Sequence, residues 1–232
     1  MYDPQAKKLN EQSPFKEIVV EISARQLSAK SETLRQMSMF LTQAVFMEVC
    51  VHPKPGLVTR HGSGAHTDMS ILTFAAGSAV LAKAFSDLQI LGMKHNGNYQ
   101  ELFGKVRRYG VSAEQELLRV TKGVNTQRGI LFAGGLLAAA AGAALNKGLD
   151  SKALCSIVAE MTQGLTENEL SGLQADRPLT AGERLYQAYG ITGIRGEVEA
   201  GFPSVRQNGL PGLKEAFAKG AGLNDALVHA LV

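Results

Sequence analysis

The stretch that decides the fold runs from Gly129 to Leu145 and reads GILFAGGLLAAAAGAAL. It carries no charge, and it is shorter than the roughly 20 residues that a membrane span needs. We interpret it as the buried central helix of a compact bundle. Its small side chains let neighbouring helices approach closely, which would suit an oligomer interface equally well.

Apolar residues recur at helical spacing through most of the chain, and alternating strand patterns are essentially absent. Caps and breakers predict further helices over residues 31–51, 68–91, 99–109, 112–121, 151–164, 181–189, 213–219 and 224–232. With 232 residues, of which 45% are hydrophobic, the chain can bury a sizeable core. The sequence therefore predicts an all-α, single-domain multi-helix bundle over residues 31–232, preceded by a polar N-terminal segment over residues 1–30.

Charge and cysteine usage narrow the class of protein. The net charge is only +3 and the basic residues are scattered, so we expect no nucleic-acid partner. Cys50 and Cys155 lie far apart without metal or redox spacing, which indicates a reducing compartment. With no signal peptide and no membrane span in the pattern, we expect a cytoplasmic protein.

The loop PKPGLVTRHGSGAHTDM, residues 53–69, joins two predicted helices. Its prolines restrict the backbone, while its glycines permit a tight turn or close approach of a ligand. Four side chains can face negative charge, so the loop suits a polyanion: Lys54, Arg60, His61 and His66. The alternative is an ordinary helix connection in which Asp68 caps the next helix.

The segment KGVNTQRG, residues 122–129, precedes the central helix. Asn125 or Thr126 can cap that helix, whose first backbone N–H groups would then form an anion site. Arg128 opposes the helix dipole, an arrangement that a bound phosphate would explain. The alternative is a capped helix with a solvated arginine.

The third segment, residues 179–203, reads LTAGERLYQAYGITGIRGEVEAGFP. Thr180 and Glu183 predict a capping box for a short helix that carries Arg184. A glycine-rich charged stretch follows, with Arg195, Glu197 and Glu199. Carboxylates in a partly desolvated cleft can act as a base or hold a divalent metal; a surface cluster of salt bridges is the alternative.

Together, EVCVHPKPGLVTRHGSGAHTDM, GVNTQRGILFAGGLLAAAAG and LTAGERLYQAYGITGIRGEVEAGFP, in this order, resemble the triphosphoribosyl-dephospho-CoA synthase family. Those enzymes supply the prosthetic-group precursor for the acyl carrier subunits of citrate lyase and malonate decarboxylase. The resemblance covers about residues 32–232, and glycine-rich loops would form the site of the helical catalytic domain.

Three departures from the family pattern accompany this resemblance. The family usually reads LVDR where this chain has Leu57, Val58, Thr59 and Arg60, and NTHKG where it has Asn125 to Gly129. A metal or base role is thereby lost at Thr59, and a proton donor at Gln127. Family members also continue through a further C-terminal part, so we expect this chain to be a fragment or a shortened member.

The resemblance implies that the ribose 2′-hydroxyl of 3′-dephospho-CoA attacks C1′ of ATP, releasing adenine and retaining the triphosphate. A carboxylate should take the hydroxyl proton, with Glu197 the first candidate and Glu48 the second. His66 or Asp68 would assist the departure of adenine, and Glu199 would stabilise the oxocarbenium-like transition state.

ATP is expected to arrive with Mg²⁺, for which Asp68 and Glu197 are the candidate ligands. The predicted substrate-binding residues are Lys54, Arg60, Ser63, Asn125, Arg128, Arg184 and Arg195. The product would go to an acyl carrier protein subunit, and a homo-oligomer is compatible with the sequence. Two alternatives stay open: a non-catalytic fragment that binds nucleotide or CoA, and a helical hydrolase of N-glycosidic bonds.

Overall fold

The computed structural model describes residues 14–171 and 178–231, with side chains from residue 29 onward. Every regular element in this part of the chain is helical, which confirms the all-α prediction. The elements are α2 (Pro14–Cys50), α3 (Ile71–Met93), α4 (Tyr99–Val120), α5 (Arg128–Lys147), η1 (Ser151–Ala153), α6 (Leu154–Met161), α7 (Leu165–Leu170), α8 (Ala181–Tyr189), α9 (Gly193–Glu199), η2 (Val205–Gly209), α10 (Leu210–Ala218) and α11 (Leu223–Leu231).

The central helix is α5, as its composition predicts. Most of its residues from Leu131 to Ala144 are buried, and α3 packs closely along it. A Cβ added at Gly142 would overlap the carbonyl oxygen of Gln89, and one added at Gly92 would overlap that of Ala139. Helices α3 and α5 therefore each contribute a glycine where their backbones come into contact. Helices α4 and α6 complete the core around this pair.

Two helices, α3 and α5, are long and apolar enough to cross a membrane by length and composition alone. In α5, 67% of the apolar window is buried inside the bundle. The core helix of a globular protein meets the same two criteria, so this test is weak evidence for a span.

Two predicted helix extents are wrong. Helix α2 begins at Pro14 rather than near residue 31, because glutamate, lysine, alanine and glutamine in the preceding segment are good helix formers. Helix α4 is continuous through Gly110, where two shorter helices were expected. Val106 and Ala113 on either side of this glycine are buried, and such packing outweighs the ~1 kcal/mol cost of a mid-helix glycine.

Three predicted helix boundaries also differ. Helix α3 starts after Ser70, which forms a capping box with Thr73, so Asp68 is not the cap. Helix α5 has Gln127 at its N-cap and no side-chain cap, which contradicts the capping role expected for Asn125 or Thr126. The predicted helix over residues 151–164 is divided into η1 and α6.

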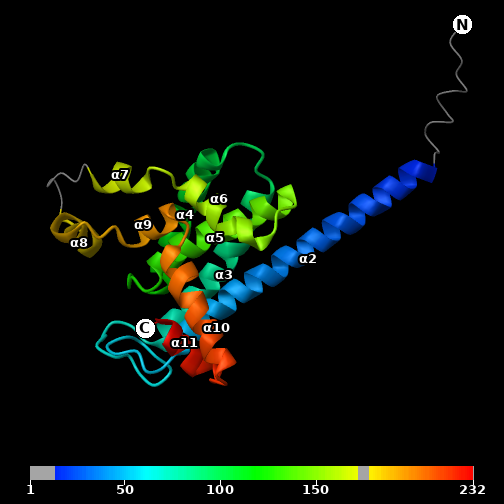
Figure 1. The fold of residues 1–232 in the computed structure, drawn as a ribbon. Coiled ribbons are helices and arrows are strands. Elements are labelled where there is room, and N and C mark those ends of the chain that lie inside the picture. The colour runs from blue at the N-terminus through cyan, green and yellow to red at the C-terminus, as the bar shows by residue number, and fades with distance from the viewer. Residues whose placement is uncertain (1–13, 172–177, 232) are drawn as a thin grey trace, which may run out of the picture.

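Different elements lie at the two opposite sides of the bundle (Figure 1). The N-terminal half of α2 projects from one side of the bundle. The loop between α2 and α3 lies at the opposite side, as do α8 and α9. Helices α10 and α11 pack on each other, and Asn224 of α11 contacts the loop through His52.

Candidate functional site

The loop between α2 and α3 is held by its own backbone. Thr59 and Gly62 form an antiparallel bridge, with N–H to O distances of 2.9 and 3.3 Å, and the Ala65 N–H donates to the Gly56 carbonyl at 3.0 Å. Gly56 and Gly64 have φ angles of 76° and 60°, which L-residues with a side chain rarely adopt. The glycines predicted to permit a tight turn therefore do so.

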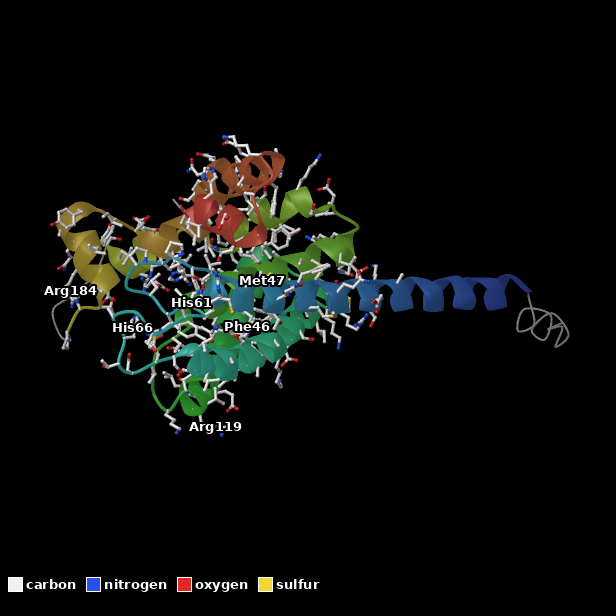
Figure 2. The ribbon with its side chains drawn as sticks, turned by 90° about the horizontal axis from the view of Figure 1, so that it is seen from below. Phe46, Met47, His61, His66, Arg119 and Arg184 are labelled. Carbon is white, nitrogen blue, oxygen red and sulfur yellow. The ribbon has the colours of Figure 1, made fainter. Side chains whose placement is uncertain are left out.

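This loop lines an open pocket of about 330 Å³. Its lining residues all belong to the loop: His52, Pro53, Lys54, Pro55, Gly56, Leu57, Thr59, His61, Gly62 and Gly64. The His52 and His61 rings meet edge to face with centroids 4.7 Å apart, and His61 is labelled in Figure 2. Lys54, His52 and His61 are the ionisable side chains among its lining residues.

Two of the predicted site residues pair with each other at the entrance of the loop. Lys54 Nζ lies 2.7 Å from Glu48 Oε1 and also donates to the Glu48 carbonyl at 2.7 Å. The Lys54 side chain is 6% exposed, whereas that of Glu48 is 53% exposed. Glu48 therefore neutralises the charge of the buried lysine side chain, and about half of the Glu48 side chain stays exposed to solvent.

The remaining loop candidates are more open. Arg60 is exposed, and its Nη1 donates to the Cys50 carbonyl at 3.0 Å and to Asn224 Oδ1 at 2.6 Å. His66 Nδ1 lies 3.6 Å from Asp68 Oδ1. Ser63 is half-buried, and its carbonyl accepts from the His66 N–H at 3.1 Å.

The start of α5 lies against α3. Gln127 is buried, and its Nε2 donates to Ser78 Oγ at 3.3 Å. No side-chain hydrogen bond caps the start of α5 in the described structure. Arg128 Nε, however, pairs with Glu114 Oε1 of α4 at 2.8 Å, while Asn125 is exposed.

The capping box predicted for α8 is confirmed. The Glu183 N–H donates to Thr180 Oγ1 at 3.3 Å, and Glu183 Oε2 accepts from the Thr180 N–H at 2.7 Å. Arg184 is exposed and donates to the Leu179 carbonyl at 2.6 Å.

The charged stretch after α8 is a short helix, α9, and not the irregular segment expected from its glycines. Arg195 Nε pairs with Glu169 Oε2 at 2.6 Å, and Arg107 Nη1 pairs with Glu169 Oε1 at 2.8 Å. Glu169 of α7 thus ties α4 to α9. Arg195, a predicted substrate-binding residue, is therefore engaged in an ion pair between helices.

The two glutamates of α9 have different surroundings. Glu197 Oε1 accepts from Ser204 Oγ at 2.5 Å, and its Oε2 accepts from the Ser204 N–H at 3.3 Å. Glu199 instead accepts from the backbone N–H groups of Gly164 at 2.6 Å and Thr166 at 3.0 Å, at the start of α7.

Burial alone would raise the pKa of Glu199, but hydrogen bonding from Thr166 and from the amides of Gly164 and Leu165 lowers it below its ordinary value. The Thr166 hydroxyl makes no hydrogen bond of acceptable geometry. We therefore assign the lowered pKa to the amides, which stabilise the charged carboxylate.

Two of the three candidate segments, the loop between α2 and α3 and the segment with α8 and α9, lie toward the same end of the molecule. Figure 2 shows His66 and Arg184 on the side away from the projecting part of α2, and Figure 1 shows the loop and α8–α9 on that side too. The pocket in the loop is nevertheless lined by loop residues alone. Within the described ranges, no group of three or more His, Cys, Asp or Glu side chains is suited to a metal ion.

The sequence predicted a charge-facing role for His61 but assigned no role to His52, and it did not single out Asn224. The histidines flank the Pro-Gly motif, so their proximity in the loop was available from the sequence. Asn224 gives no such signal, because it lies 172 residues from the His52 backbone that it contacts.

The fold and the loop define an all-helical protein with a glycine-shaped loop between α2 and α3. Comparison with known proteins makes this specific: the CitG family, described as ATP:dephospho-CoA triphosphoribosyl transferase, matches residues 34–232. The chain belongs to this family, which confirms the resemblance. No solved structure gives a significant match.

Curated relatives carry the corresponding name. A protein of Pectobacterium atrosepticum named 2-(5''-triphosphoribosyl)-3'-dephosphocoenzyme-A synthase is 38% identical over 203 residues, which are 86% of this chain and 67% of the relative. A protein of Klebsiella pneumoniae with the same name is 35% identical over 212 residues, 90% of this chain and 70% of the relative. The Malonomonas rubra relative, named with the prefix "Probable", is 39% identical over 85% of this chain and 64% of its own length. The chain thus spans about two thirds of the length of these relatives.

Proposed function

We propose that this chain carries the transferase activity for which its family is named, and joins the 5-triphosphoribosyl group of ATP to 3′-dephospho-CoA. The observation that supports this most is the match to the family over residues 34–232, which includes all three motif segments. The product would be 2′-(5″-triphosphoribosyl)-3′-dephospho-CoA.

The reaction exchanges one bond at C1′ of the ATP ribose. The bond from C1′ to adenine N9 breaks, and a bond from C1′ to the 2′-oxygen of dephospho-CoA forms. The hydroxyl proton passes to a protein carboxylate, and adenine leaves with a proton. All three phosphates stay on the transferred ribose.

Glu197 is the first candidate for the base, since its carboxylate is half-buried and oriented by Ser204. Glu48 is the second candidate, and its carboxylate already pairs with Lys54 Nζ. His66 or Asp68 would donate to the departing adenine. Glu199, already engaged by two amides, would act on the transition state only through its charge.

The phosphates of the two substrates would meet the cations of the loop and of the start of α5. Arg60 is the strongest candidate because it is exposed and its Nη1 alone is engaged among the described contacts. Lys54, Arg128 and Arg195 each have a carboxylate partner, so they would have to exchange it for phosphate. Ser63, Asn125 and Arg184 complete the proposed set.

Mg²⁺ would enter as the partner of ATP. Magnesium needs one or two protein carboxylates in addition to phosphate oxygens and water, and the Asp68 side chain is 56% exposed. The carboxylate of Glu197 has capacity beyond its contacts with Ser204. Asp68 and Glu197 are therefore the proposed protein ligands of a metal that arrives with ATP.

The setting of the reaction follows from the same proposal. We place the activity in the cytoplasm, where ATP and reduced thiols coexist, and both cysteines of the chain are free. The product would serve an acyl carrier protein subunit. A homo-oligomer is compatible with the apolar side chains exposed on α2 and α8.

The decisive experiment is incubation of the purified chain with ATP, Mg²⁺ and dephospho-CoA, followed by chromatography for free adenine. We expect adenine only when both substrates are present. Adenine without dephospho-CoA would identify a hydrolase of the N-glycosidic bond. Nucleotide binding without adenine would identify a non-catalytic binding protein.

A further inference from the structure

The side chain of Asn224, in the first turn of α11, reaches across to the loop between α2 and α3. Its Oδ1 accepts from the His52 N–H at 3.1 Å and from Arg60 Nη1 at 2.6 Å. Its Nδ2 donates to the His52 carbonyl at 2.7 Å and to Asp225 Oδ1 at 3.0 Å. Both acceptor and both donor positions of the carboxamide are therefore in use.

These partners permit only one orientation of the amide. His52 N–H and Arg60 are donors, whereas the His52 carbonyl and Asp225 are acceptors. Rotating the amide by half a turn would face donors with donors and acceptors with acceptors. The paired bonds to His52 also resemble those between two β-strands, so they hold the loop backbone in position and direction.

The two residues that Asn224 holds lie on the walls of neighbouring cavities. His52 lines the 330 Å³ pocket and its ring packs against His61. Arg60 and Asn224 line an adjacent cavity of about 130 Å³, together with Met47, Cys50, Val51, Leu223 and Leu227. One side chain from α11 thus engages the backbone of His52 and the guanidinium of Arg60.

We propose that Asn224 is a positioning residue for the substrate loop, and that it holds His52 and Arg60 where they meet the phosphates of the nucleotide. This proposal rests on the proposed function. A loop ordered before binding avoids the cost of ordering its side chains on binding. Asn224 itself contacts no substrate and acts through these two residues.

A purely structural tether between α11 and the loop is the competing role. Helix α11 packs on α10 in any case, and its Ala226 is fully buried. Loss of the amide should therefore leave this helix folded while the loop is released. Positioning and tethering then differ in kinetics, because positioning predicts weaker ATP capture without a matching loss of turnover.

The test compares Asn224→Leu and Asn224→Asp with the control Asn208→Leu, which replaces an exposed asparagine in η2. The leucine variant removes all four bonds. The aspartate variant keeps the acceptor for Arg60 and for the His52 N–H, but presents an oxygen to the His52 carbonyl. Amide hydrogen exchange at His52 reports the loop, and adenine release at varied Mg·ATP reports KM and kcat.

In Asn224→Leu we expect at least tenfold faster exchange at His52 and about a tenfold higher KM for ATP, with kcat within about threefold of the parent, as for lost ground-state binding. Asn224→Asp should have exchange rates and KM values between those of Asn224→Leu and the parent chain. Asn208→Leu should match the parent chain in both. If amide exchange at His52 and the KM for ATP are unchanged in Asn224→Leu, the proposal is wrong. It is also wrong if Asn224→Leu loses kcat together with thermal stability. If the parent chain releases no adenine, the proposed function fails; calorimetric binding of Mg·ATP to the same variants then decides the positioning role by itself.

Discussion

At the scale of single residues, α9 shows how neighbours in sequence acquire different roles. Glu197 and Glu199 are two positions apart, yet Glu197 accepts from the hydroxyl and N–H of Ser204, and Glu199 accepts from two backbone amides at the start of α7. Backbone amides that donate to a carboxylate stabilise its charged form, and the pKa of Glu199 is lowered accordingly. Glu199 is thereby a structural anchor between α9 and α7, and Glu197 is the proposed base.

Glu197→Gln should abolish adenine release, because the amide cannot take a proton, and should weaken Mg·ATP binding to the extent that the same carboxylate holds the metal. General-base help is worth on the order of a hundredfold or more. Adenine chromatography and calorimetry with Mg·ATP measure the two properties. Glu160→Gln, an exposed change on α6, is the control, and turnover near that of the control would remove Glu197 from the base role.

Glu199→Gln should destabilise the fold by about 1–2 kcal/mol at neutral pH, since it replaces a charged acceptor of backbone hydrogen bonds. The folded-state pKa of Glu199 is lowered, so its contribution is complete above the unfolded pKa of about 4.3 and is lost as the pH falls through the lower folded value. Urea unfolding of both proteins between about pH 7 and pH 3 should therefore show curves that converge in acid. A difference that persists at the lowest pH would contradict this assignment.

At the scale of elements, the contact between α3 and α5 depends on glycine. Gly92 and Gly142 allow each backbone to reach the other, and a methyl group at either position would overlap a carbonyl oxygen. Carbonyl groups inside a helix cannot move aside without breaking helical hydrogen bonds. The close spacing of α3 and α5 thus requires the absence of a side chain at both Gly92 and Gly142.

Gly142→Ala should destabilise the protein by about 1–3 kcal/mol, as expected for overpacking of a close contact. Gly110→Ala is the matched control: this glycine lies inside α4 with nothing within 4 Å of an added Cβ, so alanine should stabilise by about 0.5–1 kcal/mol through helix propensity. Chemical unfolding measures both. A neutral Gly142→Ala would show that the helices can separate at little cost.

At the scale of the whole molecule, the bundle begins well after the start of α2. Leu34 is the first buried residue for which the structure describes a side chain, and the part of α2 before it points away from the other helices (Figure 1). The fold is therefore expected to reside in residues 31–232, as the sequence predicts.

Removal of residues 1–30 should leave helical unfolding cooperative and shift Tm by less than about 2 °C, which corresponds to less than about 1 kcal/mol for a chain of this size. Circular dichroism at rising temperature is the measurement, with adenine release as a second readout. A fall in Tm of more than about 5 °C would show that this part of α2 supports the bundle.

Local patterns predicted the helices whose ends carry clear signals. The box of Thr180 and Glu183 predicted α8 over its full extent, and the uncharged run after Arg128 predicted the buried central helix. Gly110 and the glycines of α9 misled, because a glycine marks a possible break and only packing decides whether the helix continues.

The sequence by itself determined the helical class, the central helix and the family, since each depends on residue order along the chain. Only the tertiary structure decided which charged groups are free: Lys54 pairs with Glu48, Arg128 with Glu114, and Asn224 holds Arg60. The physical reason is that helical periodicity acts over a few residues, whereas an ion pair or an amide clamp depends on the path of the chain in space.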